Sequence, residues 1–199
     1  MTKSELRRTY LAKRRAISDA ELTEKSQQIA DNFFSNVDLS GVNTLHTFIS
    51  IQRYNEMDTS FIYERVWRDH PEIVTAAPRA DLTNCEMENA VFTKDTIFSE
   101  NRWGIREPVT GATIAASEID MVLVPLFCFD TNGHRVGYGK AFYDKFLSKC
   151  RPDCVKVGLS YFPPVAEISD LGTHDVMLDR CITPERIHEF GGRKNAGKH

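Results

Sequence analysis

The feature that most constrains the fold is an apolar strand pattern that leads directly into a glycine-marked loop and a helix. Residues 121–126 predict a buried strand, a turn follows at 130–133, and the loop 135–139 precedes a helix that we expect from about Lys140. Glycines let backbone N–H groups approach a ligand, and the N-terminus of a helix favours negative charge. Such a unit can hold phosphate.

This loop also carries charged and hydroxyl side chains. Arg135 and Lys140 stand at its two ends, Tyr138 and Tyr143 offer hydroxyls or stacking faces, and Asp144 offers a carboxylate to a cation. The spacing is neither a Walker A loop nor the dinucleotide fingerprint G-x-G-x-x-G. On spacing alone, a tight loop that only joins strand to helix, with Asp144 paired to Lys140, remains an equal alternative.

Composition limits the class of protein. A chain of 199 residues that is 41% hydrophobic and 27% charged is long enough for one sizeable core. The net charge of -3 gives no reason to expect a nucleic-acid surface, and no segment has the roughly 18 apolar residues of a membrane span. Five cysteines without a C-x-x-C motif or an export signal fit reduced thiols in a cytoplasmic protein.

The N-terminal segment carries a run of positive charge. A helix over residues 2–16 would place Lys3, Arg7, Tyr10 and Arg14 in one narrow sector. Cations on one stripe repel each other unless they are solvated or face an anion. From the residues alone, a solvated helix face is the favoured interpretation.

Helix and strand patterns alternate along the rest of the chain. Ser18 to Glu21 form a capping box that predicts a helix to about residue 34, and 60–69 predicts another. We expect extended segments at 42–51, 73–77, 85–92, 154–160 and 176–178, and a helix start at 183–187. Alternation of this kind predicts βαβ units, a mainly parallel sheet and helices on both faces. We therefore expect a single-domain, three-layer α/β/α fold over residues 1–190, followed by a polar, disordered tail at 191–199.

Several segments resemble one known family. Residues 135–144 (RVGYGKAFYD), with Val124-Pro125 and Phe129-Asp130 before them, are similar to the signature of the 5-formyltetrahydrofolate cyclo-ligase family, also called 5,10-methenyltetrahydrofolate synthetase. Residues 103–108 (WGIREP) resemble the family's W-G-I-x-E-P segment, and the K-x-x-L-R spacing at 3–7 matches its N-terminal segment. The chain departs at Ala141, where the family usually has a third glycine.

The resemblance implies a NagB/RpiA/CoA-transferase-like fold and a reaction. That reaction converts 5-formyltetrahydrofolate to 5,10-methenyltetrahydrofolate with ATP and Mg²⁺ and releases ADP and phosphate. Transfer of the γ-phosphoryl group to the formyl oxygen would let that oxygen leave as phosphate while N10 closes the ring. ATP and the folate are the expected partners of a monomeric protein. Little proton chemistry is required, which fits a sequence without an evident Ser-His or Cys-His pair.

The resemblance also implies the residues of the site. Arg135, Lys140 and Asp144 are the expected catalytic residues, and Asp144 and Asp175 are the expected carboxylates at Mg²⁺. The expected ATP-binding residues are Lys3, Ser4, Glu5, Leu6, Arg7, Arg135, Val136, Gly137, Tyr138, Gly139, Lys140, Ala141, Phe142 and Tyr143. The expected substrate-binding residues are Ile51, Glu56, Trp103, Tyr138, Gly139, Lys140, Ala141 and Phe142.

Other interpretations remain open at the level of sequence. Glu56 alone also fits a solvent-exposed loop residue, and Trp103 also fits a loop anchor that packs on the core. A regulator that binds a nucleotide or a phosphometabolite could keep the fold without turnover. Ala141 and the stretch 126–128, where relatives often carry smaller residues, would favour that alternative. A third possibility is another ATP-using ligase on a similar scaffold.

Overall fold

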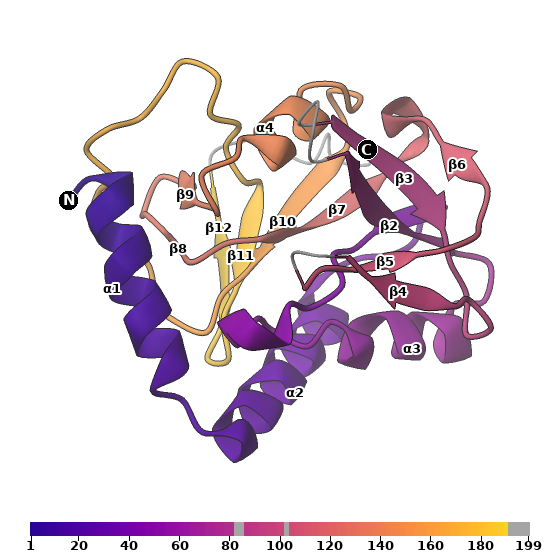
Figure 1. Cartoon of the computed structure of the whole chain (residues 1–199), viewed down its shortest axis with the longest axis horizontal. Coiled ribbons are helices and arrows are strands. Elements are labelled where there is room, and N and C mark those ends of the chain that lie inside the picture. The colour runs from indigo at the N-terminus through magenta and orange to yellow at the C-terminus, as the bar shows by residue number, and fades with distance from the viewer. Residues whose placement is uncertain (82–85, 102–103, 191–199) are drawn as a thin grey trace, which may run out of the picture.

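The structure is a computed structural model that describes residues 1–81, 86–101 and 104–190. The strands of its central sheet are β1 (Thr44–His46), β2 (Val74–Asp81), β3 (Glu86–Val91), β6 (Thr113–Ile114), β7 (Met121–Pro125), β10 (Val155–Leu159), β11 (Arg180–Ile182) and β12 (Ile187–Glu189). They form one eight-stranded sheet in the order β12-β11-β10-β7-β1-β2-β3-β6 (Figure 1). Strands β11, β10, β7, β1 and β2 run parallel, whereas β12, β3 and β6 are antiparallel to their neighbours. The predicted mainly parallel sheet is confirmed.

Helices cover both faces of this sheet. The helices are α1 (Lys3–Arg15), α2 (Asp19–Asn36), α3 (Ser60–Asp69) and α4 (Phe142–Leu147). The side chains of β7 alternate between the two faces. Leu123 packs in a core cluster with Ile29 of α2 and Ile62 of α3, whereas Val122 packs in a second cluster with Phe146 of α4. The three-layer α/β/α arrangement predicted from the sequence is therefore confirmed.

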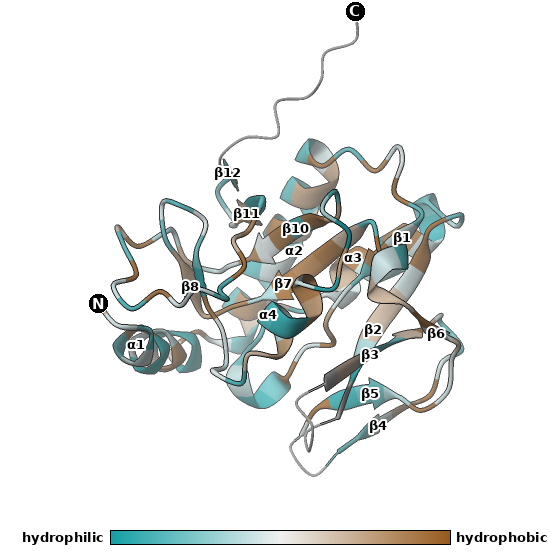
Figure 2. Cartoon of the chain, turned by 90° about the horizontal axis from the view of Figure 1, so that it is seen from above, coloured by the Kyte–Doolittle hydropathy of each residue, from teal (hydrophilic) through white to brown (hydrophobic). Residues whose placement is uncertain are grey.

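Helix α1 lies apart from these layers, against a small hairpin. The hairpin is formed by β8 (Cys128–Phe129) and β9 (Arg135–Val136). Leu6 and Tyr10 of α1 are buried in a third cluster with Phe127 of the hairpin. Figures 1 and 2 place α1 at the opposite end of the molecule from the sheet of β4 (Phe98–Glu100) and β5 (Arg106–Pro108). Two 3₁₀ turns complete the described elements, η1 (Gln52–Tyr54) and η2 (Ala116–Glu118).

The predicted capping box at Ser18 and Glu21 is confirmed, and α1 begins with another. Thr2 and Glu5 form a capping box at α1, and Ser18 and Glu21 form one at α2. In each box the hydroxyl accepts an N–H from the first turn while the glutamate accepts the cap residue's own N–H. None of the helices in the described ranges has the length and apolar character that a membrane crossing needs.

Two other predictions of secondary structure were wrong. The segment 183–187 does not start a helix, because Thr183 and Arg186 bond to each other in a turn that joins β11 to β12 (Thr183 N to Arg186 O, 2.9 Å). The strand expected over 42–51 ends at His46. Beyond it, the Phe48 carbonyl accepts the Thr59 hydroxyl at 2.6 Å instead of a strand N–H, so the chain leaves the sheet.

Gly158 in β10 allows the sheet to pack closely against the segments on its surface. A Cβ added there would lie 2.6 Å from Leu178 Cδ1 and 2.7 Å from Leu126 Cδ2. Both leucines are buried and cannot move freely. We expect Gly158→Ala to lower the free energy of unfolding by about 1–3 kcal/mol in urea titration. Gly172→Ala is the control, because its added Cβ would be 3.7 Å from the nearest atom. Equal stability of the two variants would contradict this account of β10.

Candidate active site

Loops that follow parallel strands meet at one edge of the sheet. The loop 47–58 follows β1, the segment 126–141 follows β7, and Tyr161 comes just after β10. Since these strands are parallel, their carboxyl ends lie on the same side, where ligands bind in open α/β sheets. The Tyr161 hydroxyl donates to the Glu56 carbonyl oxygen at 3.1 Å, and the Tyr138 hydroxyl donates to the Glu56 carboxylate. These bonds join the loops into one site.

Helix α1 lies against the glycine loop, defined here as residues 135–141. Arg7 Nε donates a hydrogen bond to the Gly137 carbonyl oxygen at 2.8 Å. At Gly139 the backbone φ is +83°, and an added Cβ would lie 3.1 Å from the guanidinium carbon of Arg7. Glycine at position 139 therefore serves both the left-handed backbone and the close approach of Arg7.

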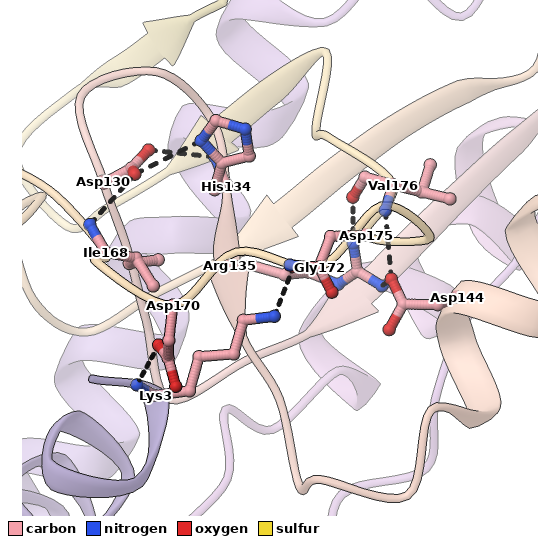
Figure 3. A network of polar contacts seen from close by, with 10 residues as sticks. All are labelled: Lys3, Asp130, His134, Arg135, Asp144, Ile168, Asp170, Gly172, Asp175 and Val176. Carbon is pink, nitrogen blue, oxygen red and sulfur yellow. Dashed lines mark hydrogen bonds and ion pairs between the residues drawn. The ribbon is translucent and has the colours of Figure 1, made fainter.

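Lys3, in the first turn of α1, contacts a loop near the C-terminus (Figure 3). Its ammonium forms an ion pair with Asp175, and its backbone N–H donates to Asp170 Oδ1 at 2.6 Å. Gly172 N–H donates to Asp175 Oδ2 at 2.7 Å. Burial alone would raise the pKa of Asp175, but the bonds from Lys3 and Gly172 hold that pKa below its ordinary value. Asp175 is therefore ionised at neutral pH beside the start of α1.

Arg135 and Asp144 form a second ion pair in the same region (Figure 3). Arg135 Nη2 lies 2.8 Å from Asp144 Oδ1, and Nη1 donates to the Val176 carbonyl. Val176 N–H donates to the same Asp144 oxygen at 3.1 Å. Asp144 thus pairs with Arg135 rather than with Lys140, which is exposed and makes no ion pair with any described residue.

The two carboxylates expected at Mg²⁺ each retain a free oxygen. Every hydrogen bond to Asp144 goes to Oδ1 and every one to Asp175 goes to Oδ2, among the residues that the structure describes. Within those residues, no cluster of three or more His, Cys, Asp or Glu side chains could hold a metal by itself. Mg²⁺ commonly uses one or two carboxylates together with substrate phosphates and water, so these residues fit a metal that arrives with a nucleotide.

Glu56 is buried, with 7% of its surface exposed, and does not behave as a solvent-exposed loop residue. Its Oε1 accepts the Tyr138 hydroxyl, and its Oε2 accepts Ile51 N–H at 2.8 Å. Arg14 Nη1 in turn donates to the Tyr138 hydroxyl oxygen at 3.3 Å. Burial raises the pKa of Glu56, while Arg14 and the two hydrogen bonds partly oppose that rise.

Arg14 and Tyr161 are residues of this region that the prediction from sequence omitted. Arg14 is the more informative of the two. It belongs to the same helical stripe as Lys3 and Arg7, which was the signal that could have identified it. Its burial, at 3% exposure, could not be predicted, because buried arginines are rare and need specific partners.

A cavity of about 710 Å³ opens beside Glu56. Its walls include Ile49, Ser50, Tyr63, Arg106 and Tyr161. Most of the residues that line it are polar or charged, and Leu22, Ile49, Tyr63 and Tyr161 supply its apolar and aromatic surface. Ile51 does not line this cavity directly but holds Glu56 through its backbone N–H. Trp103 lies outside the described residues, as do Cys85 and the segment 191–199.

The remaining predicted ATP residues differ in what their side chains can reach. Leu6 and Val136 are buried in the core, so contact with a nucleotide would have to come from their backbone atoms. Glu5 is exposed and accepts the N–H of the capping residue Thr2, and Ser4 beside it is also exposed. The Tyr143 hydroxyl is buried and has no hydrogen-bond partner among the described residues.

Comparison with known proteins identifies the family. A model described as the 5-formyltetrahydrofolate cyclo-ligase family matches residues 1–184. The chain belongs to this family.

Individual members cover most of the chain. It is 27% identical over 188 residues to the Escherichia coli K12 5-formyltetrahydrofolate cyclo-ligase, with 89% of this chain and 98% of that protein aligned. The mouse enzyme of the same name is 23% identical over 179 residues, with 84% and 86% aligned. The NMR structure of Aquifex aeolicus 5,10-methenyltetrahydrofolate synthetase has a TM-score of 0.81 and 25% identity, covering 100% of this chain and 98% of that one. A Mycoplasma pneumoniae synthetase structure, at 24% identity and a TM-score of 0.74, shares the fold over 93% and 100% of the two chains.

Ala141 is where this cyclo-ligase-family chain departs from the glycine expected in its signature. Its φ is +54°, which places an L-residue in the left-handed region directly before α4. The loop therefore keeps a backbone shape suited to glycine although the residue has changed.

We expect Ala141→Gly to raise the free energy of unfolding by about 1 kcal/mol, because it removes the left-handed strain of alanine. The measurement is urea unfolding followed by circular dichroism. Ala12→Gly, at an exposed position in the last turn of α1, is the matched control and should lower stability by about 1 kcal/mol. Destabilisation by both changes would show that position 141 does not need a left-handed residue.

Proposed function

We propose that this protein catalyses the ATP- and Mg²⁺-dependent conversion of 5-formyltetrahydrofolate to 5,10-methenyltetrahydrofolate. The observation that supports it most strongly is the arrangement of α1 on the glycine loop, with Arg7 bonded to Gly137 and Lys3 paired to Asp175. Family membership and this arrangement point to the same chemistry.

The charge balance of the site supports triphosphate binding. Lys3, Arg7, Arg135 and Lys140 outnumber the carboxylates Asp144 and Asp175, which leaves a net positive charge for the phosphates. The backbone of the glycine loop adds N–H donors. Asp144 and Asp175 would hold Mg²⁺ through their free oxygens, and the metal would neutralise charge on the β- and γ-phosphates.

The proposed reaction needs positioning more than proton transfer. The γ-phosphoryl group passes from ATP to the formyl oxygen and ADP is released. N10 then attacks the formyl carbon and gives up its proton to solvent, and the carbon–oxygen bond breaks as the oxygen leaves in inorganic phosphate. We assign Lys3, Arg7, Arg135 and Lys140 to stabilising the developing charge on the transferred group. We propose that the walls of the folate site hold the formyl oxygen in line with the γ-phosphorus.

We assign the pterin to the cavity beside Glu56. A carboxylate can accept the two parallel N–H donors of a pterin, and Glu56 is held in place by Ile51 and Tyr138. Residues 138–142 do not line this cavity: Tyr138 reaches it through its bond to Glu56, and Phe142 lines a separate cavity with Met87 and Ile114. Tyr138 and Trp103 are proposed to complete this part of the site. A cytoplasmic, monomeric protein stays part of the proposal, and the described cysteines, all free, fit a reducing compartment.

The direct test is absorbance. Mixing the protein with 5-formyltetrahydrofolate, Mg²⁺ and ATP should produce the near-ultraviolet band of methenyltetrahydrofolate. Binding of ATP without any growth of that band would reject catalysis and favour the alternative, a nucleotide- or phosphometabolite-binding regulator on the same fold.

Asp144→Ala tests the proposed metal ligand. Activity should fall by about a hundredfold or more, because both the Arg135 pair and the metal contact are lost. Melting temperature and circular dichroism report whether the variant is folded. Asp95→Ala, on an exposed loop, is the control that should keep activity. A folded Asp144→Ala protein with full activity would remove Asp144 from the metal site.

Replacement of Lys3 and Arg7 by alanine tests the proposed phosphate site. The KM for ATP should rise about tenfold, and by more than the KM for 5-formyltetrahydrofolate, because charge-assisted contacts to the phosphates are lost. Arg8→Ala with Arg15→Ala removes the same charge from the exposed side of α1 and serves as the control. If the KM for ATP is unchanged in the Lys3/Arg7 variant, α1 is excluded from the nucleotide site.

A further inference from the structure

Arg14 is a buried cation at the junction of α1, the glycine loop and the loop that carries Glu56. Its guanidinium donates to the Leu126 carbonyl and to the Tyr138 hydroxyl, the latter at 3.3 Å. It also lies 4.8 Å from the ring centroid of Phe127. The carbonyl of Arg14 accepts a hydrogen bond from the Asn55 side chain at 3.0 Å. Arg14 is thus fixed by both loops at once.

The environment of Arg14 lowers the stability of the folded protein. Its Nε is buried and has no hydrogen-bond partner among the described residues. An unsatisfied buried donor is unfavourable, and a charged one more so. A methionine or leucine would fill this space without that penalty. A residue that only held α1 on the hairpin would not need a guanidinium here, since Leu6 and Tyr10 already provide an apolar contact.

The guanidinium extends to Glu56 through a single hydroxyl. Arg14 donates to Tyr138, and Tyr138 donates to Glu56 Oε1, so one hydrogen-bonded chain joins α1 to the carboxylate. The same helix carries Arg7, which holds the Gly137 carbonyl. The two arginines therefore fix the two ends of one short segment, 137–138, from one rigid element.

We infer that Arg14 is a positioning residue for the folate: acting through Tyr138, it orients Glu56 to receive the pterin and sets it in register with the nucleotide loop. This inference rests on the proposed function. Arg14 does not touch the reacting atoms. It keeps the Glu56 carboxylate in one orientation and supplies the positive charge that favours its ionised form.

Arg14→Met is the principal test, with Arg15→Met as the matched control. Arg15 is the next residue of α1 and is exposed, so its replacement removes the same charge without entering the site. We expect Arg14→Met to raise the KM for 5-formyltetrahydrofolate about tenfold and to change the KM for ATP by less than about threefold. Arg15→Met should match the wild type in both constants. Equal KM values for 5-formyltetrahydrofolate in the two variants would overturn the inference.

Arg14→Lys and Tyr138→Phe test the same inference even if Arg14→Met does not fold. Arg14→Lys keeps the charge but not the planar fork, so it should rescue part of the loss. Tyr138→Phe removes the hydroxyl that joins Arg14 to Glu56 and should weaken folate binding to a similar extent. In the Tyr138→Phe background, Arg14→Met should cost less than it does alone, because the path to Glu56 is already broken. Full additivity would show that Arg14 does not act through Tyr138.

The pH profile separates positioning from general loss of structure. The titratable and charged groups around Glu56, among the described residues, are Arg14, Tyr138, Tyr143, Tyr161, Arg106 and the carboxylates Asp19, Asp58 and Glu64. Arg14 lowers the pKa of Glu56, so its removal should raise that pKa. Because Glu56 must be ionised to accept the pterin donors, the acid limb of kcat/KM for 5-formyltetrahydrofolate should move to higher pH in Arg14→Met. An acid limb that stays in place would count against the inference.

The outcomes distinguish this inference from the proposed function. A wild-type protein that forms no methenyltetrahydrofolate rejects the proposed function, and the inference falls with it. An active wild type whose folate KM is insensitive to Arg14→Met, Arg14→Lys and Tyr138→Phe rejects the inference alone. If Arg14→Met does not fold, the Arg14→Lys and Tyr138→Phe constants decide.

Discussion

The docking of the N-terminal helix on the glycine loop is the interaction on which the rest of the site depends. Arg7 reaches the Gly137 carbonyl across 130 positions of sequence, and Arg14 reaches Tyr138 across 124. Neither the helix nor the loop is a site alone, since a solvated cationic stripe and a short glycine turn are common features of many folds. The apolar contact of Leu6 and Tyr10 with the β8–β9 hairpin brings them together. Positive charge and backbone donors then face the same space.

Several features around this junction lower the stability of the folded protein, which is common in binding sites. Arg14 Nε and the Tyr143 hydroxyl are buried without partners among the described residues, and Ala141 holds a positive φ. Each of these features is unfavourable by itself, and structures tend to keep such features where function requires a fixed geometry. The core clusters beneath the site are made of apolar side chains, although buried His46, which lies against Phe146, also has no hydrogen-bond partner for its ring nitrogens among the described residues.

Local patterns in the sequence predicted most elements of the fold. Features that depend on contacts between distant segments could not be predicted in this way. The capping boxes, the apolar run of β7 and the glycine spacing depend on neighbouring residues, and each predicted its element. The strand at 42–51 and the helix at 183–187 were wrong because Thr59 and Arg186 supply partners that override local preference. The burial of Glu56 and Arg14 could not be predicted, because it depends on three segments that meet only in the folded chain. The individual roles of the predicted site residues stay predictions.

Hydrogen–deuterium exchange with and without ADP and Mg²⁺ tests most directly whether α1 and the glycine loop form one site. The account predicts that the nucleotide slows exchange of backbone amides in residues 3–7 and in residues 137–142 together, at the same nucleotide concentration. The C-terminal part of helix α3, residues 65–69, does not line the cavity beside Glu56, so it should be unaffected and serves as the internal reference. Protection of the loop without any change in α1 would contradict the account.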